Sequence, residues 1–296
     1  MVTPVVAAAL AIASGPALTG PRVTWASHTF AVYSSSPIQR IWKAPQVEAP
    51  LFQRVGQIAA SAKRVAFIRT VEFQPFCPAG DICPYRREVV QKDLWSGPPR
   101  GPLRRVNHGL TLDVDVDRNR ILYSNTNSVV LGRTLAKSSS VEYADVALAG
   151  RYAAWTEVPR GHNFIYVKRA LLVYDLRARR AAYRLDPAPF VDIDLAPDGT
   201  VAFGQDPTPL GGSDGGVGWA SVAEPWPHFL PGNAIPFEVR LAAGRVAYFN
   251  RGKLVVQTLD GEIVALTAAA YGDFDFDGRR LAYLRSLKSI AIARLR

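Results

Sequence analysis

The sequence of 296 residues predicts an all-β fold, arranged as one ring of four-stranded antiparallel sheets. Three observations support this prediction. The chain contains 22 prolines and 23 glycines, a content that favours short strands and tight turns over long helices. Hydrophobic residues make up 48% of the chain, which is enough to bury a large core. A short phrase also recurs at the spacing of one propeller blade.

The recurring phrase is a turn, a basic or polar residue, two mostly small or aliphatic residues and an aromatic. Its seven copies are Arg22–Trp25, Arg64–Phe67, Arg120–Tyr123, Tyr152–Trp155, Thr200–Phe203, Arg245–Tyr248 and Arg280–Tyr283. Successive aromatics lie about 43 residues apart on average, and four strands at that period are typical of a propeller blade. We therefore expect a single seven-bladed β-propeller. Six or eight blades would follow if one irregular copy is miscounted.

Each copy of the phrase is expected to form the second strand of its blade. An alternating segment such as Val191–Leu195 precedes the turn, and a third strand such as Lys253–Gln257 follows the aromatic. A fourth strand often comes next, as in Gln39–Trp42 and Ala181–Arg184. Period-two alternation between turn residues is typical of antiparallel strands. The seventh unit ends at Arg296 after only three strands.

The first 14 residues carry an uncharged apolar run that allows two interpretations. The run is shorter than the ~20 residues a membrane helix needs, and Ala11-Ile12-Ala13 has the small-x-small form of a signal cleavage site. No Lys or Arg precedes it. Residues 1–14 are therefore either a signal-like segment, which we favour, or a strand that completes the seventh blade and closes the ring. Residues 15–296 form the propeller, and no other stretch is apolar enough to span a bilayer.

Two segments resemble the repeats of a known family. Asp194–Phe203 and Asp275–Tyr283 are similar to the repeats of TolB-like and WD40-like propellers, in which a Pro-Asp-Gly turn precedes a strand ending in Ala-aromatic. The full turn is present at Pro197–Gly199, and the seventh unit keeps Asp277-Gly278. The Gly-His and Trp-Asp marks of true WD40 repeats are absent. The resemblance implies a binding scaffold in the cell envelope or outside the cell, with no chemistry to carry over.

The predicted first strands hold many carboxylates. In a propeller the first strand lines the central channel, and residues two apart share a face. Eight of the fourteen alternating positions are acidic: Asp113, Asp115, Asp145, Asp192, Asp194, Glu238, Asp273 and Asp275. This collar is either a site for Ca²⁺, another divalent cation or a cationic ligand, or a water-filled polar channel whose aspartates bind backbone amides. We favour the second interpretation.

The two cysteines, Cys77 and Cys83, are separated by five residues that include Pro and Gly. No second Cys pair or nearby His completes a zinc site, which normally needs four ligands. A short-loop disulfide is the favoured interpretation over a reactive dithiol, and it implies an oxidising compartment. It would stiffen the longest insertion of the second blade, residues 71–86, where a binding loop is expected.

Aromatic residues cluster late in the fifth unit, where Trp219, Trp226 and Phe229 lie near two prolines. They either form a surface that stacks on a sugar or peptide, or pack between blades, and we favour packing. None of the four histidines, His108 among them, forms a local pair with Cys, Ser or a second His in a pattern that indicates chemistry. We expect structural or exposed roles for them.

Taken together, these features favour a non-catalytic, extracytoplasmic scaffold. It would bind a protein, a peptide or another ligand through blade loops or the channel mouth, as a monomer and without a cofactor unless a divalent cation occupies the channel. The net charge of +10 is dispersed along the chain, which argues against a nucleic-acid partner. The alternative is a metal-assisted propeller hydrolase, lyase or lactonase that uses the channel carboxylates.

Overall fold

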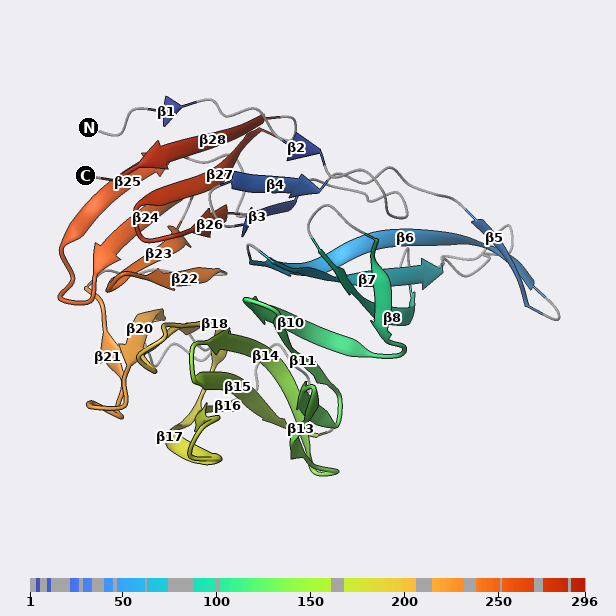
Figure 1. The fold of residues 1–296 in the computed structure, drawn as a ribbon, viewed down its shortest axis with the longest axis horizontal. Coiled ribbons are helices and arrows are strands. Elements are labelled where there is room, and N and C mark those ends of the chain that lie inside the picture. Colours follow the sequence, from blue (N-terminus) through green and yellow to red (C-terminus); the bar gives the residue numbers. More distant parts are fainter. Residues whose placement is uncertain are drawn as a thin grey trace, which may run out of the picture.

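The fold is a ring of β-sheets around a central axis (Figure 1). The computed structural model describes residues 4–5, 10–11, 22–26, 29–33, 40–44, 47–61, 63–73, 88–98, 102–160, 168–205, 215–231, 238–250, 252–268, 274–286 and 289–295. Within these residues there are 28 strands in seven sheets and no helix. The all-β propeller predicted from the sequence is confirmed.

Four consecutive sheets each contain four antiparallel strands, in chain order from the axis outward. They are β10 (Thr111–Asp117), β11 (Arg120–Asn125), β12 (Ser128–Leu131) and β13 (Arg133–Lys137); β14 (Val141–Ala149), β15 (Tyr152–Pro159), β16 (Arg169–Asp175) and β17 (Arg180–Ala188); β18 (Phe190–Leu195), β19 (Val201–Gln205), β20 (Gly216–Ala220) and β21 (His228–Phe229); and β22 (Val239–Ala242), β23 (Arg245–Asn250), β24 (Lys253–Thr258) and β25 (Ile263–Ala268). In each of these sheets the recurring phrase forms the second strand, as expected.

The other three sheets complete the ring between β22 and β10 (Figure 1). They are β26 (Phe274–Phe276), β27 (Arg280–Ser286) and β28 (Ser289–Arg294) with β1 (Pro4–Val5); β3 (Arg22–Ala26) and β4 (Thr29–Tyr33) with β2 (Leu10–Ala11); and β5 (Arg40–Ala44), β6 (Val47–Ala60), β7 (Val65–Phe73), β8 (Glu88–Gly97) and β9 (Arg104–Asn107). Strand β1 pairs antiparallel with β28, with Pro4 opposite Ala293. The two ends of the chain therefore meet in one sheet.

Two details differ from the strand order expected for the first blade. Gln39–Trp42 was expected as its fourth strand, but β5 (Arg40–Ala44), which contains most of this segment, pairs with β6 in the following sheet. Only two residues join β5 to β6, and so short a connection favours a hairpin over a crossing to the previous sheet. In addition, β3 contacts the inner strands β6 and β26, although its phrase was expected one position outward. The first-strand positions that the alignment on the aromatic gives this blade, Gly15 and Ala17, lie outside the described residues.

The aromatic residue of the recurring phrase anchors the packing between blades. Phe67, Trp155, Phe203, Tyr248 and Tyr283 are all buried. The core around Phe203, for example, combines side chains from the sheet that starts at β14 and the sheet that starts at β18. Burial of one large apolar side chain contributes roughly 1.5–3 kcal/mol. The phrase recurs because each blade needs one large side chain to fill the space against its neighbour.

The turns between first and second strands gather on one face of the ring, which we call the turn face. There the basic residue of the phrase links neighbouring blades: Arg120 donates to the carbonyl of Gly150, and Arg245 to that of Gly278 at 3.3 Å. Gly150 has a φ of 55°, and a Cβ there would lie 3.2 Å from Pro197 in the next turn. The turn face is thus closely packed from blade to blade.

Candidate functional site

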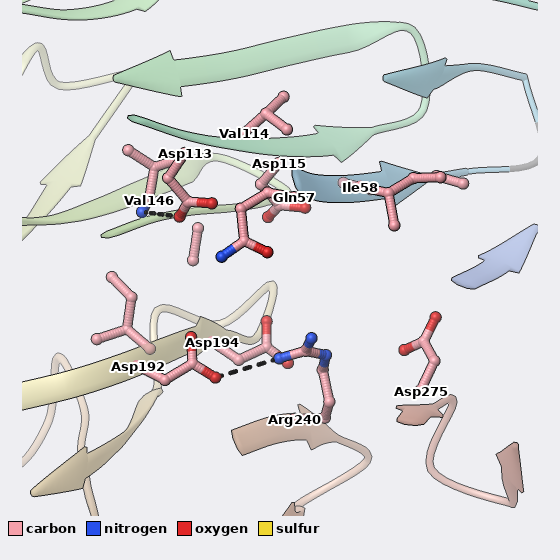
Figure 2. Close-up of a pocket in the computed structure, with 14 residues that line it drawn as sticks. Gln57, Ile58, Asp113, Val114, Asp115, Val146, Asp192, Asp194, Arg240 and Asp275 are labelled. Carbon is pink, nitrogen blue, oxygen red and sulfur yellow. Dashed lines mark hydrogen bonds and ion pairs between the residues drawn. The ribbon is translucent and has the colours of Figure 1, made fainter. Parts of the chain in front are cut away.

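The inner strands enclose a cavity of about 160 Å³ at the centre of the ring (Figure 2). Strands β6, β10, β14, β18, β22 and β26 supply its lining. The lining residues are Gln57, Ile58, Ala59, Ala60, Asp113, Val114, Asp115, Val146, Ala147, Asp192, Ile193, Asp194, Arg240 and Asp275. Alternation along each strand directs every second side chain toward the axis, so carboxylates from separate blades meet across one space.

Five of the eight carboxylates singled out in the sequence line this cavity: Asp113, Asp115, Asp192, Asp194 and Asp275. The remaining three do not line it or cannot be placed. The carboxylate of Asp145 accepts hydrogen bonds from Thr156 and Arg169 of its own sheet, both at 2.8 Å. Glu238 lies just before β22, and Asp273 lies outside the described residues.

The Asp-x-Asp pairs hold adjacent blades together. Asp113 accepts a hydrogen bond from the backbone N–H of Val146 at 2.8 Å, and Asp115 accepts one from Leu148 at 2.6 Å. Both donors belong to β14, the inner strand of the next blade. The carboxylates of β10 therefore bond to a strand that shares no backbone ladder with it.

The same arrangement recurs two blades further on. Asp192 accepts from the N–H of Val239 at 2.8 Å, and Asp194 accepts from Leu241 at 2.6 Å. An innermost strand pairs with another strand along one edge only, so the N–H groups on its unpaired edge need other acceptors. Leaving such a buried N–H unpaired costs about 1–3 kcal/mol. These aspartates act as blade-to-blade connectors, whereas the polar-channel interpretation expected bonds to backbone amides without placing those amides in the next blade.

Burial and mutual repulsion perturb the acidity of the cavity. Burial raises the pKa of Asp115 and of Asp192 to about 6, and that of Asp194 to about 7. The pKa of Asp113 lies well above its usual value because of burial and the nearby charge of Asp145. The cavity therefore changes its charge around neutral pH.

Arg240 is the cation of the cavity lining. Its guanidinium Nη1 lies 3.3 Å from Asp192 and donates to the carbonyl of Val239 at 2.7 Å (Figure 2). Burial alone would lower the pKa of Arg240, but Asp192, Glu238, Asp275 and Asp194 raise it above its usual value. One fixed positive charge thus faces several carboxylates. Among the described residues, no three His, Cys, Asp or Glu side chains come together as a metal-binding group.

Two other expectations concern the cysteine loop and membrane-spanning segments. Cys77, Cys83 and most of the 71–86 insertion lie outside the described residues, so the disulfide stays a prediction. In the part of the chain that the structure covers, no helix has the length and hydropathy needed to span a membrane.

A second polar cluster was not foreseen in the sequence. The carboxylate of Asp93, whose side chain is 0% exposed, accepts hydrogen bonds from Arg69 and His108, each at 2.8 Å. Gln91 adds a third at 2.5 Å. Burial opposes the charge, but these hydrogen bonds lower the pKa of Asp93 below its usual value. Arg69 and His108 lie 24 and 15 positions from Asp93 in the sequence, so the alternation of side chains within one strand does not reveal the cluster.

A groove of about 320 Å³ lies between β17 and β21, and Arg184, Asp186 and Gln205 line it together with apolar residues. We call it the aromatic groove, and its lining includes Phe190, Phe203, Pro225, Trp226, Pro227 and Phe229. Trp226 and Phe229 are each 53% exposed, so the expectation that they pack between blades is wrong for these two. Phe229 lies in β21, at the edge of its sheet, with its ring centroid 5.9 Å from that of Phe203, and Trp226 lies just before this strand. Trp219 instead stacks on His228, with ring centroids 4.2 Å apart.

No protein-family model and no curated protein matches the chain. Several solved structures are similar to it, each at low sequence identity. The Dos1 propeller is 7% identical, with a TM-score of 0.49, over 83% of this chain and 74% of that one. The β-propeller domain of the Trilobed protease from Pyrococcus furiosus is 8% identical, with a TM-score of 0.47, over 78% and 89%. Apo AztD from Citrobacter koseri is 9% identical, with a TM-score of 0.47, over 86% and 88%.

Proposed function

We propose that this chain is a non-catalytic propeller scaffold that binds a protein or peptide partner outside the cytoplasm. The observation that carries the proposal is the aromatic groove between β17 and β21. Large aromatic side chains that remain half exposed next to a hollow are typical of protein-binding surfaces, where they supply the energetic anchors. The flanking Pro225 and Pro227 restrict the backbone that presents Trp226, which lowers the entropy cost of binding.

The chemistry of the channel supports the same proposal. Four of its carboxylates accept hydrogen bonds from the inner strand of the next blade, as described for Asp113, Asp115, Asp192 and Asp194. Because these hydrogen bonds connect neighbouring blades, the presence of the carboxylates is explained without a substrate. The extracytoplasmic location is supported by the apolar run at residues 1–14 and by the spacing of Cys77 and Cys83.

The proposal is tested by affinity capture from an extract of the organism that encodes the chain. Wild-type protein is compared with the variant Trp226→Ala/Phe229→Ala. The matched control is Ile263→Ala/Leu266→Ala, which removes two apolar side chains of β25 that are 60% and 51% exposed. We expect a protein that is enriched by wild type and by the control, lost with the groove variant, and bound again by purified wild type in calorimetry. Equal enrichment by all three proteins would refute the role of the groove.

A metal-assisted hydrolase, lyase or lactonase is the second candidate. It is favoured by Asp194, whose pKa of about 7 suits a general acid or base and whose side chain lines the cavity beside Arg240. The test is turnover of chromogenic phosphate esters, carboxylic esters and lactones with Ca²⁺, Mn²⁺ or Zn²⁺. The scaffold proposal expects no turnover above blank and no rise of Tm with Ca²⁺. Turnover that disappears in Asp194→Asn, together with a Tm that rises with metal concentration, would establish the enzyme.

A further inference from the structure

A strongly basic hollow of about 590 Å³ lies on the turn face, away from the aromatic groove. Five cationic side chains line it: Lys63, Arg118, Arg120, Arg151 and Arg177. No carboxylate is part of the lining, and Leu176 is its one large apolar residue. The residues come from the turns β6–β7, β10–β11, β14–β15 and β16–β17, so three consecutive sheets contribute.

The hollow is built on a braced framework. The hydroxyl of Ser61 donates to the carbonyl of Arg118, which joins the first turn to the second. Arg120 donates to the carbonyl of Gly150, which joins the second turn to the third. The N–H of Leu176 donates to the carbonyl of Arg151 at 2.9 Å, which adds the fourth turn. The backbone that carries the five cations is therefore fixed before any ligand arrives, which lowers the cost of binding.

The positive charge of the hollow is only partly neutralised. Asp117 pairs with Arg120, and Asp175 pairs with Arg151 at 3.1 Å. The pKa of Asp175 lies below its usual value because Ala178 N–H donates to it and because Arg151 and Arg177 lie close by. Lys63 and Arg118 are exposed and form no ion pair with any residue that the structure describes. Five cations thus face two carboxylates, and three positive charges remain for a ligand.

We propose that this hollow docks an acidic, Asp- and Glu-rich segment of the partner protein. The inference rests on the proposed scaffold function and specifies the chemistry of its partner. Arg guanidinium groups bind carboxylates in a bidentate manner, and a cluster of three to five of them favours several carboxylates at once. No aromatic side chain lines the hollow, so a single-stranded nucleic acid would find no surface for base stacking.

The experiment measures fluorescence anisotropy of a labelled octa-aspartate peptide titrated with the full-length protein at low salt. The hollow variant is Lys63→Ala/Arg118→Ala/Arg177→Ala. The control, Arg104→Ala/Arg133→Ala/Lys137→Ala, removes the same number of arginines and lysines from exposed positions on β9 and β13. We expect the Kd to rise about tenfold or more in the hollow variant and to change less than about twofold in the control. The single variant Arg118→Glu repeats the test if the triple variant does not fold.

Other results would overturn the inference. An equal loss in both triple variants would mean that the peptide responds only to net charge. Tighter, hollow-dependent binding of an eight-nucleotide DNA strand would identify a nucleic-acid site, and hollow-dependent binding of phosphatidylserine vesicles without peptide binding would identify a membrane surface. The peptide assay does not involve Trp226 or Phe229. A groove variant that loses its captured partner yet keeps peptide affinity separates the two proposals, and so does the reverse pattern.

Discussion

Replacement of Asp194 by Asn should stabilise the protein, and the gain should increase with pH. Asp194 lies in the central cavity and accepts hydrogen bonds from Leu241 N–H at 2.6 Å and from Leu195 N–H at 2.8 Å. The Oδ1 of Asn can still accept one of them, whereas the negative charge is removed. Burial disfavours that charge more than Arg240 favours it, which is why the pKa of Asp194 is raised to about 7.

The size of the effect follows from proton linkage. A raised pKa means that the folded protein binds the proton more tightly than the unfolded chain. The stability from Asp194 is therefore full below the ordinary pKa of 3.8 and is lost as the pH rises through about 7. At about 1.4 kcal/mol per pKa unit, the wild-type carboxylate costs roughly 2 kcal/mol at pH 5 and roughly 4 kcal/mol at pH 8. Asn removes this cost at both values, but it leaves one of the two N–H groups unpaired at a cost of about 1–3 kcal/mol, so the net gain is close to zero at pH 5 and clear at pH 8.

The assay is urea unfolding at pH 5 and pH 8, followed by the fluorescence of the six tryptophans. We expect Asp194→Asn to increase the free energy of unfolding by about 2–3 kcal/mol more at pH 8 than at pH 5. The control is Asp198→Asn in the next turn, where the exposed side chain accepts Thr200 N–H at 2.9 Å. It should change stability by less than about 0.5 kcal/mol at either pH. A variant that is less stable at pH 8 than wild type would refute the argument, because it would show that the ionised carboxylate is required.

Two further predictions concern contacts between blades and within the second blade. Tyr183→Phe should lower the free energy of unfolding by about 1–2 kcal/mol in urea titrations, because the buried hydroxyl of Tyr183 lies 2.9 Å from Gly199 O and 3.1 Å from Ala220 O in the next sheet. An unchanged midpoint would contradict that link. Asp93→Ala should cost about 3–5 kcal/mol at pH 7, because Arg69 is left without its buried partner. Since the pKa of Asp93 is lowered, the loss should shrink as the pH falls below about 4, and a pH-independent loss would contradict the charge argument.

The fold was predictable because its information is local. The alternation of Val191–Leu195, the turn at Pro197–Gly199 and the aromatic Phe203 are all visible within about a dozen residues. The hydrophobic alternation and the turn together set the register of one hairpin. The prediction was wrong for Gln39–Trp42 because β5, which contains most of this segment, joins its next neighbour through two residues, and the pattern alone does not say which sheet a strand belongs to.

The candidate site was predictable only in part, because its geometry depends on distant residues. Spacing along the first strands correctly placed Asp113, Asp115 and Asp194 on the cavity wall. It could not show that Asp145 bonds to Arg169, which comes from the third strand of the same sheet. Trp226 likewise lies just before β21, the strand at the edge of its sheet, and a composition of aromatics and prolines does not reveal which strand lies at an edge.

The cavity at the axis and the turn face differ in charge. The side chains that link neighbouring blades account for part of this difference, and for basic residues such as Arg120 in the phrase. Among the described residues, the strands of one blade form no backbone ladder with those of the next, so side chains make most of the links. Near the axis the link is an aspartate that accepts from an amide 33 or 47 residues away. On the turn face it is an arginine, such as Arg120, that donates to a carbonyl. The aspartates bring negative charge to the axis, and the arginines and Lys63 of the turns bring positive charge to the turn face. Where four turns of β6 to β17 converge, the arginines and Lys63 exceed the carboxylates, and the basic hollow results.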